Sequence, residues 1–328
     1  MRLAQFARQN NFGLTASVPL GYFLGLESLR LGEVHLMAGH DYTDEDVGNI
    51  ISLEHVNLHI PSQELAILFY VVGLGFTRDP YLSVGTGNMW INVGEQQFHL
   101  PTRGEQVIAG TIGIVVPDLE LLQGRLKAVR ERLTGTRFNW SLEDDHVMVT
   151  CPWGNRFRCH GPGPKFGDTA LGLPYVEFHT KPRTAAGIGR FYEEVMGAPS
   201  VIESEGGVPV ARIAIGRNQW LLFRETEQEI PPYDGHHIAV YIVNFSSPFG
   251  LLKKHKLIME DVSNHQFRFK DVVDPKSGKK VFALEHEVRS LRHALYHRLL
   301  VNRDPTQIQS SYARGSDALI PVVKNQRP

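Results

Sequence analysis

Short alternations of apolar and polar residues recur along this chain, and the first is the segment 51–61, which reads ISLEHVNLHIP. Its apolar side chains share one face of a half-buried strand, and the other face carries His55, Asn57 and His59. Pro61 ends the strand, and the sequence SQELAILFYVVGL then predicts a helix that begins at a serine cap. Three short strands, YLSVG, NMWINVG and QQFHLP, complete a β-α-β-β-β unit.

The same order of elements recurs three more times. Strand patterns open the later units at 110–118, 173–180 and 236–243, and a helical pattern follows each of them. The second unit closes on HVMVTCP and NRFRCHGP around the turn PWGN, and the fourth closes on QFRFKDVVD and KKVFALEHEV. The chain therefore predicts four units of one kind and an α+β architecture.

The first and third units resemble each other in detail. An FY pair begins at Phe69 in one helix and at Phe191 in the other, and the hairpins INVGEQQFHL and IAIGRNQWLL contain Gly94 and Gly216. Both pairs are 122 positions apart. A constant offset at two places indicates an internal repeat rather than two unrelated helix–strand units.

The four units predict two domains of two units each. The Gly- and Pro-rich stretch GPGPKFGDTALG separates the second unit from the third and is typical of a linker. The predicted parts are an N-terminal extension (1–50), a first domain (51–162), a linker (163–172), a second domain (173–290) and a C-terminal tail (291–328). We expect the tail from Asn302 onward to be extended or disordered.

Charge and composition narrow the class of protein. Lys and Arg number 34 and Asp and Glu 35, so no bulk positive charge is available to hold nucleic acid. No run of apolar residues reaches the ~20 that a membrane-spanning helix needs. These features predict a cytoplasmic protein with no nucleic-acid or membrane partner. Arg2 and Arg8, with no acidic residue before Glu27, leave open an organellar transit peptide over residues 1–26.

The units, the strand EHVNLHIP, the helix with FY that ends in LGF and the hairpin PWGNRFRC together resemble the vicinal oxygen chelate superfamily. Its members include glyoxalases, bleomycin-resistance proteins and extradiol dioxygenases. The resemblance extends over residues 51–290 and implies four βαβββ modules paired into two glyoxalase-like domains with curled mixed β-sheets. It also implies a divalent metal ion (Fe, Mn, Zn or Ni) in the trough of a curled sheet, held by residues of the first and last strands.

In the first predicted domain the resemblance implies two metal ligands, His55 and His99. The second unit offers Thr111 and Arg158 at the corresponding positions, and neither is a usual ligand. A guanidinium there would repel a cation and would suit a carboxylate or phosphate substrate. The alternatives are a hydrogen-bonded structural histidine at position 55 and a surface salt bridge at position 158.

In the second predicted domain the resemblance implies Glu177, His237 and Glu285 as metal ligands and catalytic residues. Glu285 meets its position only if a loop and a bulge shift the last strand, because Phe282 lies four residues after Gly278. One histidine with two carboxylates departs from the two histidines and one glutamate of the extradiol dioxygenases. Ordinary solvated or hydrogen-bonded polar side chains are the alternative for each of them.

The resemblance also implies residues near these ligands that contact the substrate. His59 and His179 lie four positions past the ligand positions of their strands, where this superfamily often contacts substrate. The other predicted substrate-binding residues are Arg158, Tyr175 and Tyr241.

Two further groups of residues predict no chemistry. Cys151 and Cys159 flank the turn PWGN and predict buried thiols. His286, His293 and His297 lie among arginines and predict a solvated basic segment near the end of the chain.

Two functions of different classes remain after the sequence is read. The first is a metal-dependent enzyme, of the dioxygenase, lyase or isomerase type, that acts on a small oxygenated organic molecule. The second is a metal-free protein that binds or sequesters a small ligand in the trough, as bleomycin-resistance proteins do. The substrate, the metal, the active domain and the choice between monomer and homodimer stay open.

Overall fold

The computed structural model describes residues 45–82 and 85–302, and the predictions for residues 1–26 and for the tail after residue 302 lie outside them. The strands, in chain order, are β1 (Ile50–Asn57), β2 (Thr77–Arg78), β3 (Asn88–Val93), β4 (Gln96–Pro101), β5 (Gly110–Val115), β6 (Asn139–Leu142), β7 (His146–Thr150), β8 (Arg156–His160), β9 (Gly172–Thr180), β10 (Ser200–Glu205), β11 (Val208–Gly216), β12 (Gln219–Glu225), β13 (His237–Ile242), β14 (Ile258–Ser263), β15 (Gln266–Val273) and β16 (Lys280–Ser290). The α-helices are α1 (Gln63–Ala66), α2 (Leu119–Val129), α3 (Ala185–Phe191) and α4 (Ser246–Lys254). Short 3-10 helices are η3 (Glu131–Leu133) and η4 (Pro164–Phe166), and π-helical turns are η2 (Ile67–Gly73) and η5 (Tyr192–Met196).

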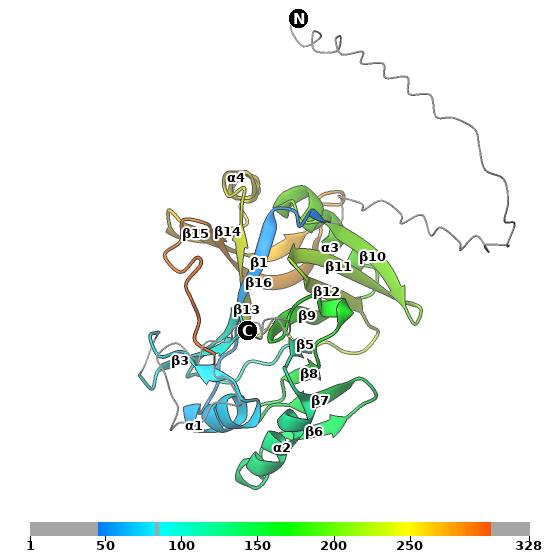
Figure 1. Cartoon of the computed structure of the whole chain (residues 1–328). Helices are drawn as coiled ribbons and strands as arrows, with labels where there is room; N and C mark the ends of the chain where they lie inside the picture. Colours follow the sequence, from blue (N-terminus) through cyan, green and yellow to red (C-terminus); the bar gives the residue numbers. More distant parts are fainter. Residues whose placement is uncertain (1–44, 83–84, 303–328) are drawn as a thin grey trace, which may run out of the picture. The chain divides into compact units, whose positions relative to one another are not determined.

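These strands form two mixed sheets of eight strands each, which confirms the predicted α+β class (Figure 1). The first sheet has the order β14-β15-β16-β13-β1-β4-β3-β2, and the second has the order β10-β11-β12-β9-β5-β8-β7-β6. In each sheet two opening strands pair antiparallel at the centre, and each opening strand pairs parallel with the last strand of its own unit. The described helices include none long and apolar enough to cross a membrane.

The partners within each sheet differ from the sequence prediction. The first sheet joins the first unit to the fourth, and the second sheet joins the second unit to the third. The expected trough made by the first and second units is therefore wrong. The opening strands of the four units show the same alternation of apolar and polar residues. Once each has paired with the last strand of its own unit, one edge remains for another unit, and the alternation does not determine which unit pairs there. Where the domain boundaries lie along the chain stays a prediction.

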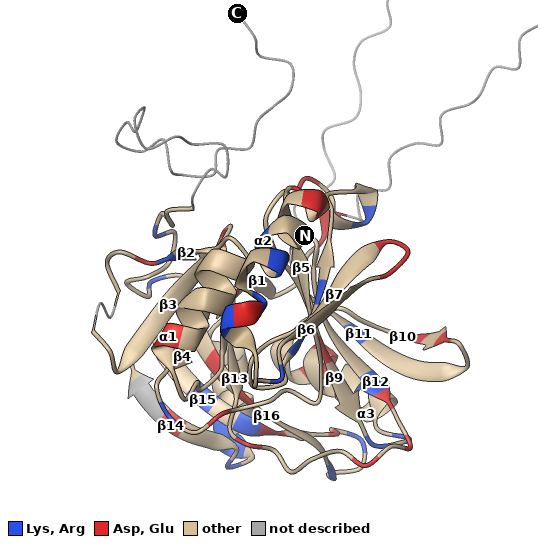
Figure 2. Cartoon of the chain, turned by 90° about the horizontal axis from the view of Figure 1, so that it is seen from below, with Lys and Arg blue, Asp and Glu red and all other residues tan. Residues whose placement is uncertain are grey.

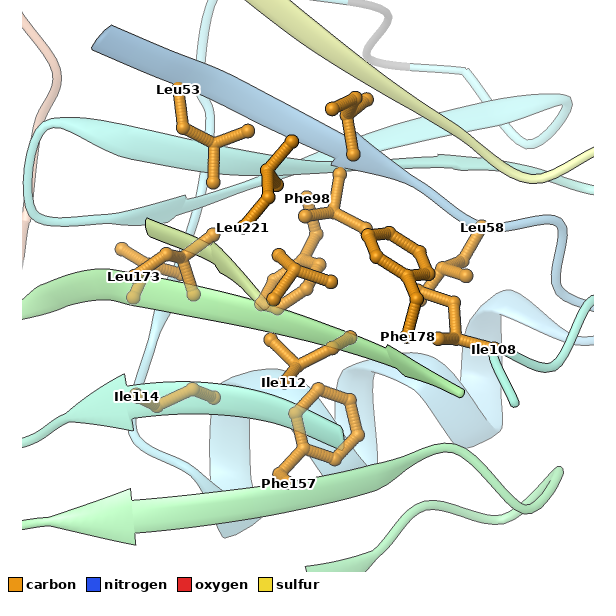
Figure 3. Close-up of a cluster of buried hydrophobic side chains, with 14 of the residues drawn as sticks. Leu53, Leu58, Phe98, Ile108, Ile112, Ile114, Phe157, Leu173, Phe178 and Leu221 are labelled. Atoms are coloured by element: carbon orange, nitrogen blue, oxygen red, sulfur yellow. The ribbon is translucent and has the colours of Figure 1, made fainter. Parts of the chain in front are cut away.

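A single hydrophobic cluster extends across both sheets (Figure 3). Leu53 and Phe98 reach it from the first sheet, and Ile112, Phe157 and Phe178 reach it from the second. All five side chains are at most 1% exposed. The inward faces of the two sheets therefore share one core, while their opposite faces are available for polar groups.

Both FY pairs lie where an α-helix changes into a π-helical turn. Ser62 caps helix α1, because its hydroxyl accepts a hydrogen bond from the N–H of Leu65 (3.3 Å), and the helix continues into η2. Helix α3 continues into η5 in the same way. Phe69 and Phe191 are fully buried, so the π-helical turns direct both aromatic pairs into the core.

Two glutamine side chains connect the sheets. The Oε1 atom of Gln96 accepts a hydrogen bond from the N–H of Leu173 in the second sheet (3.0 Å). The Oε1 atom of Gln219 accepts the corresponding bond from the N–H of Leu53 in the first sheet (3.0 Å). Each buried amide therefore fixes the start of a central strand of the opposite sheet.

The chain after β16 returns to the first unit. Arg298 binds the carboxylate of Asp79 (2.7 Å). The side-chain amide of Asn302 accepts from the N–H of Gly94 (3.0 Å) and donates to its carbonyl (2.9 Å). Asn302 is therefore a buried anchor rather than the start of an extended tail.

Candidate metal centre

Three histidines from three strands of the first sheet converge in its trough. His55 lies on β1, His99 on β4 and His237 on β13, and each offers a nitrogen within 4.8 Å of the other two. The ring centroids of His99 and His237 each lie 5.6 Å from that of His55. The structure therefore brings together three of the residues that the sequence analysis named, although it had assigned them to two different domains.

The register of the central strands shows which residue takes the fourth ligand position beside the three histidines. Strands β1 and β13 pair around Val56 and Ile238, which relates the two halves of the sheet by an approximate two-fold axis. His55 and His237 precede these two residues and so occupy equivalent positions. His99 lies beside Asn57, one residue after Val56, and Glu287 lies beside Ala239, one residue after Ile238. The position equivalent to that of His99 is therefore Glu287, two residues beyond the predicted Glu285.

Both glutamates lie next to His237. The Glu287 carboxylate is 3.7 Å from its Nε2 atom, and the Glu285 carboxylate is 3.8 Å from its Nδ1 atom. Arg268 binds Glu285 (2.9 Å) and Glu287 (2.5 Å), and Arg289 binds the other oxygen of Glu287 (2.6 Å). Two guanidinium groups therefore compensate the buried charge of Glu287.

Two of the histidines have a buried ring nitrogen without a hydrogen-bond partner among the described residues. The Nδ1 atom of His55 bonds the carboxylate of Glu54, which Arg289 binds in turn (2.9 Å). The Nε2 atoms of His55 and His237 are buried and have no hydrogen-bond partner in residues 45–82 and 85–302. Buried polar atoms are normally satisfied, so such unpartnered atoms indicate a missing ligand. A carboxylate behind a histidine is also the usual outer support of a metal ligand.

Burial favours the neutral imidazole of His99 and of His237. Burial first, and then the neighbouring His55, lower the pKa of His99 to about 3. Burial, with His55 and Arg268, also lowers the pKa of His237 far below its usual value. Burial raises the pKa of Glu54, but His55 and Arg289 outweigh this effect and bring it to about 2. Neutral imidazole is the form that binds a metal, so the protonation states suit one.

Neighbouring side chains orient the ring of His99. Trp90 stacks on it with the centroids 4.0 Å apart and the planes inclined by 9°. The side-chain amide of Asn88 lies 2.8 Å from its Nε2 atom. The plane of this ring is therefore set before any ligand arrives.

The residues present fit a divalent transition metal. Imidazole nitrogens and a carboxylate are ligands of zinc, iron, manganese and nickel. Nitrogens bound to one tetrahedral ion at 2.0–2.1 Å lie about 3.4 Å apart. Donor atoms within 4.8 Å of one another can reach that separation by small side-chain rotations.

The other predicted ligand lies in the second sheet. Glu177 on β9 binds Arg224 (3.1 Å) and lies 3.8 Å from His179. The expected set of Glu177, His237 and Glu285 is therefore wrong, because β9 and β13 belong to different sheets. An ion pair with a guanidinium accounts for Glu177 without a metal.

The predicted substrate contacts divide between the two sheets. Arg158 and Tyr175 lie together in the second sheet, with 3.4 Å between the guanidinium and the phenol oxygen, so Arg158 does not share a trough with His55. His59 follows β1, and Tyr241 on β13 lies beside Arg289. His59 and Tyr241 therefore belong to the sheet of the histidine cluster, and their role in binding stays a prediction.

The sequence analysis missed part of the surroundings. Arg268, Arg289 and Glu54 complete the environment of the cluster, and no local motif marks them. The even spacing of Glu285 and Glu287 on one strand was the single signal for Glu287. His286 was predicted to be solvated, which is wrong. Its ring is fully buried and stacks on Phe269.

Lys and Arg residues and Asp and Glu residues are interspersed along the described chain (Figure 2). Cys151 and Cys159 are buried free thiols, as predicted.

Solved structures of other proteins share the fold of this chain. A candidate dioxygenase from Bacillus subtilis shares this fold, with a TM-score of 0.51 and 13% identity over 76% of this chain and 88% of the other. Glyoxalase I from Zea mays shares it with a TM-score of 0.50 and 13% identity over 73% of this chain and 92% of the other. No protein family profile and no curated protein sequence matches the chain. At this identity the likeness establishes the fold alone.

Proposed function

We propose that this protein is a divalent-metal-dependent enzyme that acts on a small oxygenated organic substrate, by dioxygenase, lyase or isomerase chemistry. The convergence of His55, His99 and His237, with two buried Nε2 atoms that lack a partner in the described chain, carries the proposal. The names of the similar structures, a dioxygenase and a glyoxalase, support the same class of chemistry.

The protein would hold the metal through the three histidines and Glu287. When bound, such an ion acts as a Lewis acid toward the oxygens of a substrate. Glu54 keeps the proton of His55 on Nδ1, so that Nε2 presents a lone pair. Arg268 and Arg289 hold the carboxylate of Glu287 in place.

Glu285 is the carboxylate placed to move a substrate proton. Its side chain is 16% exposed, whereas that of Glu287 is 3% exposed. Arg268 binds one of its oxygens, so the group is oriented but remains accessible from the trough. A positioned carboxylate of this kind can act as a general acid or base.

Elemental analysis of the purified protein tests the proposal. We expect wild type and His255→Ala to hold about one more iron, manganese, zinc or nickel per chain than His55→Ala and His237→Ala do. His255 is exposed at the end of α4 and serves as the matched control. Circular dichroism checks that the variants fold. Equal metal content in wild type and both trough variants would contradict the assignment.

A metal-free ligand-binding protein is the second candidate function. One observation favours it. Both carboxylate oxygens of Glu287 already bind arginines, so the histidines are the residues that still have an atom available to bind a metal. Under this alternative, no preparation would bind metal after reconstitution, and the folded trough would still bind small ligands.

A further inference from the structure

A second group of metal-ligand side chains lies on the second sheet. Asp145, His146 and His160 each offer a donor atom, and the three atoms lie within 4.8 Å of one another. His146 on β7 and His160 on β8 are direct partners in antiparallel register, so their side chains leave the same face of the sheet. Their ring centroids are 5.5 Å apart.

The inner histidine of this group lacks a partner. His160 is 4% exposed, and its Nδ1 atom has no hydrogen bond to any described residue. Its Nε2 atom lies 2.9 Å from the hydroxyl oxygen of Tyr175. If Nδ1 bound a metal, the proton would be on Nε2 and could be donated to Tyr175, which is the usual support for a histidine ligand.

The outer residues are arranged around a carboxylate. Asp145 bonds the Nδ1 atom of His146 (2.6 Å), and Lys165 of η4 binds its other oxygen (3.0 Å). Asp145 and Lys165 are exposed, whereas His146 is largely covered. The group is therefore open to solvent on one side and closed by His160 on the other.

We propose that Asp145, His146 and His160 form a second divalent-metal site, of the zinc class, independent of the histidine cluster in the first sheet. Two imidazoles and a carboxylate on one face match the donors that zinc, cobalt and nickel prefer, and water would complete the coordination. Lys165 competes with the cation for Asp145.

Isothermal titration of the full-length, metal-stripped protein with Zn²⁺ tests this site. The background is His237→Ala, which removes the proposed metal centre of the first sheet. In that background we expect one equivalent of Zn²⁺ to bind. We expect His146→Ala to weaken that binding tenfold or more and Lys165→Met to strengthen it, because the latter removes a repelling charge.

His255→Ala in the same background is the control and should leave the titration unchanged. Because His146 is largely covered, thermal unfolding monitors the fold of each variant. Absence of Zn²⁺ binding in the His237→Ala background, or binding that His146→Ala leaves intact, would overturn the second site. Neither result tests the proposed metal centre of the first sheet. Zn²⁺ binding at that centre is measured separately, in the single variant His146→Ala.

Discussion

The imidazole rings of His55 and His237 lie 5.6 Å apart, measured between their centroids, although they belong to the first and the fourth unit of the chain. The antiparallel pairing of β1 with β13 produces this contact. The site therefore forms only when the two ends of the described chain join in one sheet, and neither unit alone contains three of its donors.

The register around Val56 and Ile238 predicts different roles for the two glutamates of β16. Glu287→Gln should weaken Zn²⁺ binding at the histidine cluster tenfold or more, since it removes the negative donor. Glu285→Gln should change it by less than about threefold, because that residue lies outside the four related positions. Competition titrations with a chelator measure the Zn²⁺ affinity of both variants. The opposite order of effects would make Glu285 the fourth ligand.

The two tyrosines of the FY pairs should respond differently to loss of their hydroxyl groups. The hydroxyl of Tyr192 donates to Nε2 of buried His286 (2.6 Å), whose Nδ1 donates to the carbonyl of Leu284. Tyr192→Phe leaves that Nε2 unpaired and should cost about 1–3 kcal/mol of unfolding free energy.

Tyr70→Phe is the matched control. The Tyr70 hydroxyl is buried with no hydrogen-bond partner among the described residues, so its removal should be neutral or stabilising. Urea denaturation of both variants gives the comparison. Equal losses in the two would show that the hydrogen bond to His286 contributes nothing.

Two glycines should give opposite results when changed to alanine. Gly94 has φ +66°, and a Cβ atom there would lie 2.0 Å from the carbonyl oxygen of Leu171, in the predicted linker. Gly94→Ala should therefore cost about 2 kcal/mol or more, since both backbone strain and a backbone clash oppose it.

Gly124 lies on the exposed face of α2, where an added Cβ meets no atom within 4 Å. Gly124→Ala should raise the unfolding free energy by up to about 1 kcal/mol, because alanine has the higher helix propensity. Thermal melts of both variants test the pair. A stable Gly94→Ala protein would mean that the hairpin can move away from the linker.

An ion pair between the third and fourth units should make stability depend on pH. Arg190 of α3 binds both oxygens of Asp274, at 2.9 and 3.0 Å, and this contact lowers the pKa of Asp274 below 3.8. A carboxyl group with a lowered pKa in the folded state stabilises the fold above its unfolded pKa and loses that effect as pH falls.

Arg190→Met should therefore destabilise the protein by about 1–2 kcal/mol at pH 6–7. The difference from wild type should shrink as the pH falls below about 4. Urea denaturation between pH 2.5 and 7 measures it. A difference that is constant over this range would show that lost packing, rather than charge, accounts for the effect.

The sequence by itself determined the local elements. The alternation in ISLEHVNLHIP indicated a strand, observed as β1, and the faces it assigned to Val56 and His55 are those that meet the core and the trough. The hairpin glycines Gly94 and Gly216 were recognised from their shared offset of 122 positions, and both have a positive φ, which glycine adopts readily. These features depend on neighbours within a few residues, so local patterns are sufficient to predict them.

Only the tertiary structure decided which units share a sheet. The opening strands of all four units expose similar free edges, so their own patterns could not tell that β1 pairs with β13 rather than with β5. That choice placed His237 beside His55 and separated Glu177 from both. It also set the register that makes Glu287 the partner of His99, because strand register follows from long-range packing rather than from nearby residues.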